Sequence, residues 1–149
     1  MPQPTACSWY ARFGTPCRSA MPNKAILCVD DEDVILETLK EQLKRRLGQD
    51  YLYEGASDAS EAWEVLEDLV AENVEVLIVV SDWLMPGMKG DEFLTQVHQK
   101  YPKIVTVMLT GQADQAAIAR AQESANLYRC LYKPWSEEEL ANTILSGLA

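Results

Sequence analysis

Four short apolar runs of the sequence are each followed at once by residues that can do chemistry. The charged groups and the hydroxyl in these places belong to Asp30, Asp31, Asp82, Thr110 and Lys133. Ionised carboxylates within a few ångströms of one another repel strongly, and a divalent cation with oxygen ligands relieves that repulsion. A metal ion, an ammonium group and a free carboxylate together suit a phosphoryl group, which an aspartate can accept as nucleophile. If the fold brings these residues together, they predict a magnesium-dependent phosphoryl site.

Short apolar runs alternate with amphipathic segments from Lys24 onward. The apolar runs predict strands at residues 25–29, 51–56, 76–80, 104–109 and 127–132. The amphipathic segments predict helices at residues 34–47, 58–70, 90–101, 114–124 and 136–148. Right-handed crossovers then produce a doubly wound α/β domain, with a parallel sheet of five strands and five helices on its two sides. The carboxyl ends of its strands share one edge, where the reactive residues would meet.

Local signals mark where several of these helices begin and end. Asp58 with Glu61, and Ser136 with Glu139, have the spacing of a capping box, which starts a helix. Gly48 stands where the helix over residues 34–47 should stop. The helical spacing of apolar residues also predicts buried positions, among them Val34, Val70 and Leu145.

Composition excludes several classes of function. The net charge of −10 disfavours nucleic acid and anionic membrane surfaces as partners. We expect no membrane-spanning helix, because no apolar run approaches the roughly 18 residues that a span needs. The four cysteines have no C-x-x-C spacing, which argues against a zinc site or a disulfide framework. The simplest setting is therefore a reducing cytoplasm.

Residues 1–22 differ from the rest of the chain. They contain four prolines and two arginines but no acidic residue, and they show no apolar periodicity. They also lack the 7–15-residue apolar core of a secretory signal. We interpret them as a disordered or non-native tail, and residues 23–149 as one domain.

Four motifs, in order, resemble those of the receiver domain of two-component response regulators over about residues 24–149. They are the segments Ile26–Glu32, Ser81–Gly90, Met108–Gly111 and Tyr132–Trp135. Each motif is modest alone, but four of them at the ends of the expected strands make a specific signal. The resemblance implies a flavodoxin-like sheet with the strand order 2-1-3-4-5. It also implies a phosphoryl group received from a histidine kinase or a phosphotransfer protein.

The resemblance assigns a role to each site residue. Asp82 would accept the phosphoryl group and would also contact the magnesium ion. Asp31 would bind the ion directly, Asp30 largely through water, and Leu84 through its backbone carbonyl.

The remaining roles concern the phosphoryl group itself. Lys133, before a cis peptide to Pro134, would neutralise the phosphoryl oxygens, and Thr110 would donate its hydroxyl to them. Gly111 would leave room for the phosphodonor. Trp83 and Trp135 flank these positions and are expected at a partly exposed rim.

One position departs from the family pattern. Receivers often carry Tyr or Phe three residues before the lysine, and here that residue is Cys130. In the family this aromatic side chain rotates together with the threonine, and here that switch is absent or rebuilt. This departure concerns how phosphorylation would change the surface formed by the last two helices and the strand between them. The same surface, over residues 114–148, is a possible homodimer face, with contact points expected at Ala116, Ile118 and Arg120.

Two other functions remain open at this point. A pseudo-receiver would bind partners without phosphorylation, although such proteins typically lose an acidic residue, the threonine or the lysine. A magnesium-dependent phosphatase of the haloacid dehalogenase kind also uses a nucleophilic aspartate after a strand. Such a phosphatase normally has a second aspartate two residues later, where this chain has Leu84.

Overall fold

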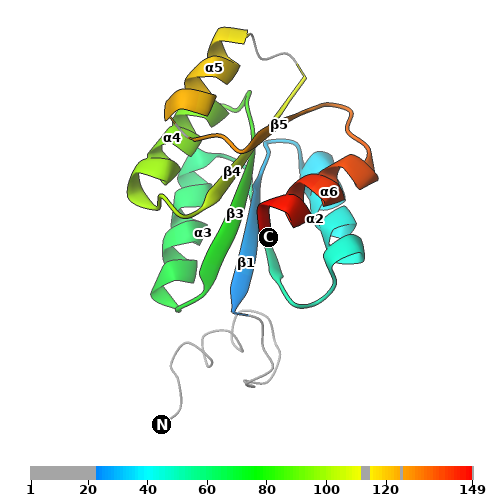
Figure 1. Ribbon diagram of the computed structural model, residues 1–149. Coiled ribbons are helices and arrows are strands. Elements are labelled where there is room, and N and C mark those ends of the chain that lie inside the picture. Colours follow the sequence, from blue (N-terminus) through cyan, green and yellow to red (C-terminus); the bar gives the residue numbers. More distant parts are fainter. Residues whose placement is uncertain (1–22, 112–114, 125, 149) are drawn as a thin grey trace.

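The computed structural model describes residues 23–111, 115–124 and 126–148, so the tail predicted at residues 1–22 lies outside the described part. Within that part, five parallel strands form one sheet in the order β2-β1-β3-β4-β5 (Figure 1). The strands are β1 (Lys24–Val29), β2 (Leu52–Ala56), β3 (Glu75–Asp82), β4 (Val105–Thr110) and β5 (Arg129–Tyr132). The helices are α2 (Asp33–Leu47), α3 (Ala59–Ala71), α4 (Gly90–Lys100), α5 (Gln115–Ser124) and α6 (Glu137–Leu148). The predicted doubly wound, flavodoxin-like α/β fold is confirmed.

Helices cover both faces of the sheet, with α3 and α4 on one side and α2 and α6 on the other (Figure 1). Strand β1 shows how the sequence supports this arrangement. Leu27 and Val29 pack in the core cluster that contains α3 and α4, while Ile26 and Cys28 pack with α2 and α6. Successive side chains of a strand point to opposite faces, so a strand covered on both sides has to be apolar throughout.

The expected helix ends are present. The Oδ1 atom of Asp58 accepts a hydrogen bond from the backbone N–H of Glu61, and Ser136 Oγ accepts one from Glu139 N–H. Both bonds satisfy N–H groups that a first helical turn leaves without a partner. Gly48 ends α2 with φ of 85°, a conformation that glycine adopts at little cost.

Three side chains predicted to be buried are exposed. Val34 is 77% exposed, and Val70 and Leu145 also face solvent. Each lies beside the stripe that its helix buries, and neighbouring helical residues are about 100° apart around the axis. Leu69 and Ile144 are fully buried, and the residues that follow them, Val70 and Leu145, are turned toward solvent.

The proposed contact points on α5 need a similar correction. Ala116 and Arg120 are exposed, as expected, but Ile118 is only 6% exposed and belongs to the core cluster with α3 and α4. It is therefore unavailable for self-association. Ile118 instead packs α5 against the rest of the domain.

The sheet register aligns the strand ends that carry the candidate site. Asp82 pairs with Leu109 across β3 and β4, and Thr110 pairs with Tyr132 across β4 and β5. The residues just beyond these ends therefore share one edge. None of the helices in the described part combines the length and apolar character needed to cross a membrane.

Candidate functional site

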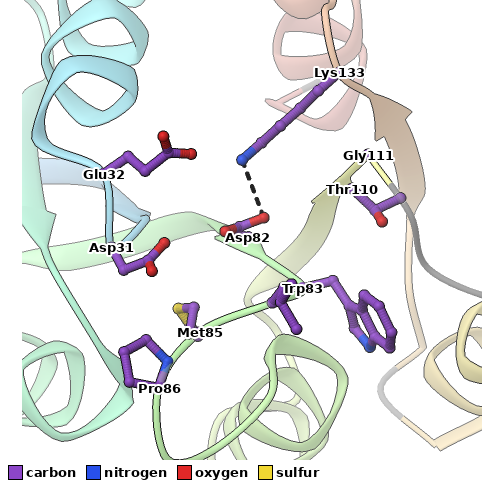
Figure 2. Close-up of a pocket in the computed structure, with 10 residues that line it drawn as sticks. Asp31, Glu32, Asp82, Trp83, Met85, Pro86, Thr110, Gly111 and Lys133 are labelled. Atoms are coloured by element: carbon purple, nitrogen blue, oxygen red, sulfur yellow. Dashed lines mark ion pairs between the residues drawn. The ribbon is translucent and has the colours of Figure 1, made fainter.

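A pocket of about 500 Å³ opens at the carboxyl edge of the sheet. Figure 2 shows side chains entering it from the segments after β1, β3, β4 and β5. The pocket is lined by Asp31, Glu32, Asp82, Trp83, Leu84, Met85, Pro86, Thr110, Gly111 and Lys133. It therefore contains most of the residues that the sequence assigned to the site.

Lys133 joins two buried carboxylates. Its Nζ atom lies 3.1 Å from Asp30 Oδ2 and 3.2 Å from Asp82 Oδ1 (Figure 2 draws the second pair). Asp30 is fully buried and Asp82 is 5% exposed. The second oxygen of Asp30 accepts a hydrogen bond of 2.9 Å from Glu32 N–H, so both oxygens of this carboxylate have a donor. Asp30, whose position is fixed by these bonds, thus holds the ammonium group of Lys133 at the Asp82 carboxylate.

The electrostatics of the site disfavour a charged Asp82. Burial, and then the negative charge of Asp30, raise the pKa of Asp82 to about 6, although the ammonium group of Lys133 acts in the opposite direction. Burial alone would lower the pKa of Lys133, but its hydrogen bonds and charge interactions with the two aspartates raise it. An excess of negative charge therefore remains beside Asp82, which an added cation would relieve.

The acidic residues after β1 form a group suited to a hard cation. Asp30, Asp31 and Glu32 each offer a carboxylate oxygen, and these oxygens lie within 4.8 Å of one another. Asp31 and Glu32 are exposed, which leaves space for the water molecules that magnesium retains. Glu32 was recognised in the sequence but given no role. Its place in the acidic run was the available signal.

The remaining site residues surround the acceptor. Thr110 is buried at the end of β4, and its carbonyl accepts a hydrogen bond of 2.9 Å from Lys133 N–H. Among the described residues, a Cβ atom added to Gly111 would meet Lys133 Cβ alone, at 4.0 Å. The peptide bond before Pro134 is cis, as the resemblance implied. Leu84 lies in the loop after β3 with its side chain exposed.

Gly90 has a part in the site that sequence reasoning missed. A Cβ atom added to it would lie 2.1 Å from the carbonyl oxygen of Asp82. Its N–H also donates a hydrogen bond of 2.7 Å to the carbonyl of Trp83. The first residue of α4 therefore packs directly on the backbone of the acceptor, a contact that requires glycine. The Pro-Gly-Met-Lys-Gly segment was the only hint in the sequence.

Cys130 occupies the position that the family often gives to an aromatic residue. It is half-buried on β5, pairs in register with Met108 and packs against the core on the α3 and α4 side. Tyr132, two residues further along β5, is exposed. Tyr128, which lies just before the strand, is also exposed, and its hydroxyl contacts Ser146 of α6 on the opposite side of the sheet. Trp83 and Trp135 are partly exposed, as expected for the rim.

Comparison with known proteins agrees with this geometry. The family model of the response regulator receiver domain matches residues 26–145. The chemotaxis protein CheY homolog of Campylobacter jejuni subsp. jejuni is 32% identical over 117 residues, which are 77% of this chain and 85% of that protein. The hydrogenase transcriptional regulatory protein HoxA of Cupriavidus necator is 30% identical over 119 residues, or 80% of this chain.

Solved structures give the same result. The signal receiver domain of an HD domain-containing protein from Pseudomonas fluorescens Pf-5 superposes with a TM-score of 0.75 and 34% identity, covering 84% of this chain and 94% of that one. Some relatives are much longer than the match, since the aligned part is 23% of HoxA and 12% of the sensor kinase CckA of Brucella abortus. From fold, site and similarity together, the chain belongs to the response regulator receiver domain family.

Proposed function

We propose that this chain receives a phosphoryl group on Asp82 from a phosphohistidine of a histidine kinase or phosphotransfer protein. The observation that carries the proposal is the Asp82 carboxylate itself. It is 5% exposed, has the Lys133 ammonium group at 3.2 Å, and lies in a pocket that Thr110 and Gly111 also line. This arrangement supports the proposal, because the Asp82 carboxylate would act as the nucleophile and the Lys133 ammonium group would stabilise its product.

In the proposed transfer, an Asp82 oxygen attacks the phosphorus atom while the phosphorus–nitrogen bond to the donor imidazole breaks. The imidazole keeps the electron pair of that bond and takes up a proton, and Asp82 becomes an acyl phosphate. Lys133 is in reach to pair with the new phosphoryl oxygens. Thr110 lines the pocket and would donate its hydroxyl to one of them. The chain then catalyses only its own phosphorylation and dephosphorylation.

The acidic residues fit a bound magnesium ion. Asp31 and Asp82 would hold it together with the backbone carbonyl of Leu84, and Asp30 would act mainly through water. The charges of the site support this assignment, because the carboxylates of Asp30, Asp31 and Asp82 outnumber the ammonium group of Lys133, which contacts two of them. When bound, the ion would supply positive charge to the transferred phosphoryl oxygens.

We further propose that the phosphoryl group changes protein contacts on the surface formed by α5, β5 and α6. Tyr132 is 54% exposed there, and Leu145 is also exposed, so apolar area is available to a partner or to a second copy. A cytoplasmic location and a kinase partner suit this function. The sensor-kinase and regulator relatives support a place in two-component signalling.

The test is the intact mass of the protein after incubation with acetyl phosphate, with and without magnesium. We expect one phosphoryl adduct in the wild type that requires magnesium, is removed by hydroxylamine, and is absent from Asp82→Asn. Asp58→Asn, at a helix cap that does not line the pocket, is the matched control and should form the adduct.

Two results would contradict the proposal. No adduct under any condition, in folded protein, would favour a pseudo-receiver that binds partners without phosphorylation. Steady turnover of a generic phosphomonoester would favour a phosphatase instead.

A further inference from the structure

A buried carboxylate on α4 connects the acceptor loop with α5. Asp91 Oδ1 accepts a hydrogen bond of 3.1 Å from the indole Nε1 of Trp83. Its other oxygen, Oδ2, lies 3.6 Å from Nη2 of Arg120 on α5. Asp91 is buried, whereas the Arg120 side chain is 64% exposed. One carboxylate is thus shared between a residue of the pocket wall and a residue of the neighbouring helix.

Trp83 is the residue that would sense the state of Asp82. It follows Asp82 directly, and its backbone is anchored by hydrogen bonds to Leu109 O (2.8 Å) and from Gly90 N (2.7 Å). Its indole lines the pocket, and Figure 2 shows it on the Thr110 side. The ammonium group of Lys89 lies 5.0 Å from the centre of its ring. The backbone of Trp83 is fixed by hydrogen bonds, and its ring contacts Asp91 and Lys89. A change of charge at Asp82, or a shift of the loop that follows it, would therefore move the indole relative to these partners.

Helix α5 depends on α4 for its place on the domain. It packs chiefly against α4, and its Ile118 enters the core on that side. Cys130 leaves β5 without the large aromatic side chain that often connects the site with this surface. The contact from Asp91 to Arg120 is a direct polar connection from the acceptor loop to α5.

We propose that Asp91 is a positioning residue that couples the orientation of Trp83 to the stability of α5 through Arg120. The inference rests on the proposed phosphorylation of Asp82. A buried carboxylate is destabilised when it loses a hydrogen-bond donor. If the indole of Trp83 moves away from Asp91, the interaction of Asp91 with Arg120 should therefore become stronger or change its geometry. Because the guanidinium group of Arg120 is exposed, its pair with Asp91 is weak. We therefore expect a modest coupling, an effect of about two- to fivefold on the exchange rates of α5.

The experiment measures amide hydrogen exchange in residues 115–124, with magnesium alone and with magnesium plus beryllofluoride as a phosphoryl analogue. In the wild type we expect the exchange rates of α5 to differ about two- to fivefold between the two states. Asp91→Asn keeps an acceptor for the indole but removes the charge that faces Arg120. Arg120→Gln removes the other partner from an exposed site and is expected to fold.

Both variants should still form the acetyl phosphate adduct but lose most of the difference in α5 exchange. Arg120→Lys, which keeps the positive charge, should restore it. The matched control is Arg46→Gln, because Arg46 forms an exposed pair of similar length, 3.7 Å, with Glu137 on the other side of the sheet. This control should behave as the wild type.

The outcomes separate the coupling from the function on which it rests. An unchanged difference in Asp91→Asn and Arg120→Gln, or no difference in wild type that does form the adduct, overturns the coupling and leaves phosphorylation standing. Loss of the difference in Arg46→Gln also overturns it, since the effect would then be one of general charge. Failure of the wild type to form an adduct overturns the proposed function itself.

Discussion

Asp82 is a carboxylate that the protein buries beside a second buried carboxylate, Asp30. Its pKa of about 6 means that the folded chain binds a proton there more tightly than the unfolded chain, whose Asp has an ordinary pKa of 3.8. Lys133 is the described positive group that contacts both carboxylates. The protonation state of Asp82 near neutral pH therefore depends on Asp30 and Lys133 as well as on its own burial.

The first prediction concerns the pH dependence of stability without divalent cations. Because the folded pKa of Asp82 is raised, its favourable contribution is complete below about pH 4 and is lost as pH rises through about 6. The free energy of unfolding of Asp82→Asn, minus that of the wild type, should increase by about 1–3 kcal/mol between pH 4 and pH 7. Urea unfolding in a chelator, at several pH values, measures this difference. A constant difference over that range would contradict the assigned environment.

The second prediction concerns Lys133. Its replacement in Lys133→Met leaves Asp30 and Asp82 without the ammonium group that both contact, and removes the charge proposed to face the phosphoryl oxygens. We expect the rate of adduct formation from acetyl phosphate to fall by about 10²-fold or more. The exposed Lys103, outside the pocket, provides the control variant Lys103→Met. Equal rates in the two variants would exclude the proposed role.

At the scale of elements, the loop between β3 and α4 holds the acceptor in position. It leaves the sheet at Trp83, whose N–H donates to Leu109 O, and returns at Gly90 on the backbone of Asp82. The start of α4 is therefore packed against Asp82, the proposed acceptor. A change in this loop moves the acceptor even when no catalytic side chain is altered.

The third prediction compares two glycines of the site. In Gly90→Ala the new methyl group would lie 2.1 Å from the Asp82 carbonyl oxygen, so the backbone has to move. We expect a loss of about 1–3 kcal/mol in stability and a slower phosphorylation. In Gly111→Ala the methyl group meets, within the described part of the chain, Lys133 Cβ alone at 4.0 Å, and stability should change by about 0.5 kcal/mol or less. Thermal unfolding of both variants checks the order, and a reversed order would contradict the packing described.

At the scale of the whole molecule, the parallel sheet concentrates charge at one edge. The chain carries a net charge of −10, and Asp30, Asp31, Glu32 and Asp82 all stand where strands end. Helices cover both faces of the sheet (Figure 1), and the pocket that contains Asp31 and Asp82 lies at this edge. The topology that brings these carboxylates together therefore also makes them repel one another in the folded state. A bound cation would reduce that repulsion.

The fourth prediction follows for magnesium. Binding to the folded state alone stabilises it by mass action, by about 1.4 kcal/mol at a free concentration tenfold above the dissociation constant. We expect magnesium to raise the unfolding temperature of the wild type but to have little effect on Asp31→Asn. Glu67→Gln, remote from the pocket, should respond as the wild type. An equal shift in all three proteins would mean that the ion acts on general charge and not at this site.

The fold was predictable from the sequence because its signals are local. The apolar run over residues 25–29, the capping boxes at Asp58 and Ser136, and the stop at Gly48 each involve residues close together in the chain. Strict alternation of strands and helices, with right-handed crossovers, then predicted a doubly wound parallel sheet, and the family resemblance supplied its strand order. The candidate residues were found for the same reason, since strand ends of a parallel sheet share one edge. Their individual roles remain predictions.

Only the tertiary structure decided which groups are in contact. The approach of Gly90 to Asp82, the sharing of Asp91 between Trp83 and Arg120, and the burial of Ile118 all depend on how helices pack. Periodicity gives the face of a helix but neither the width of its buried stripe nor its height on the sheet, so Val34 was wrongly placed inside. The sequence determined which chemistry the chain carries and at which edge. Packing determined which side chains hold the acceptor and connect it with the rest of the molecule.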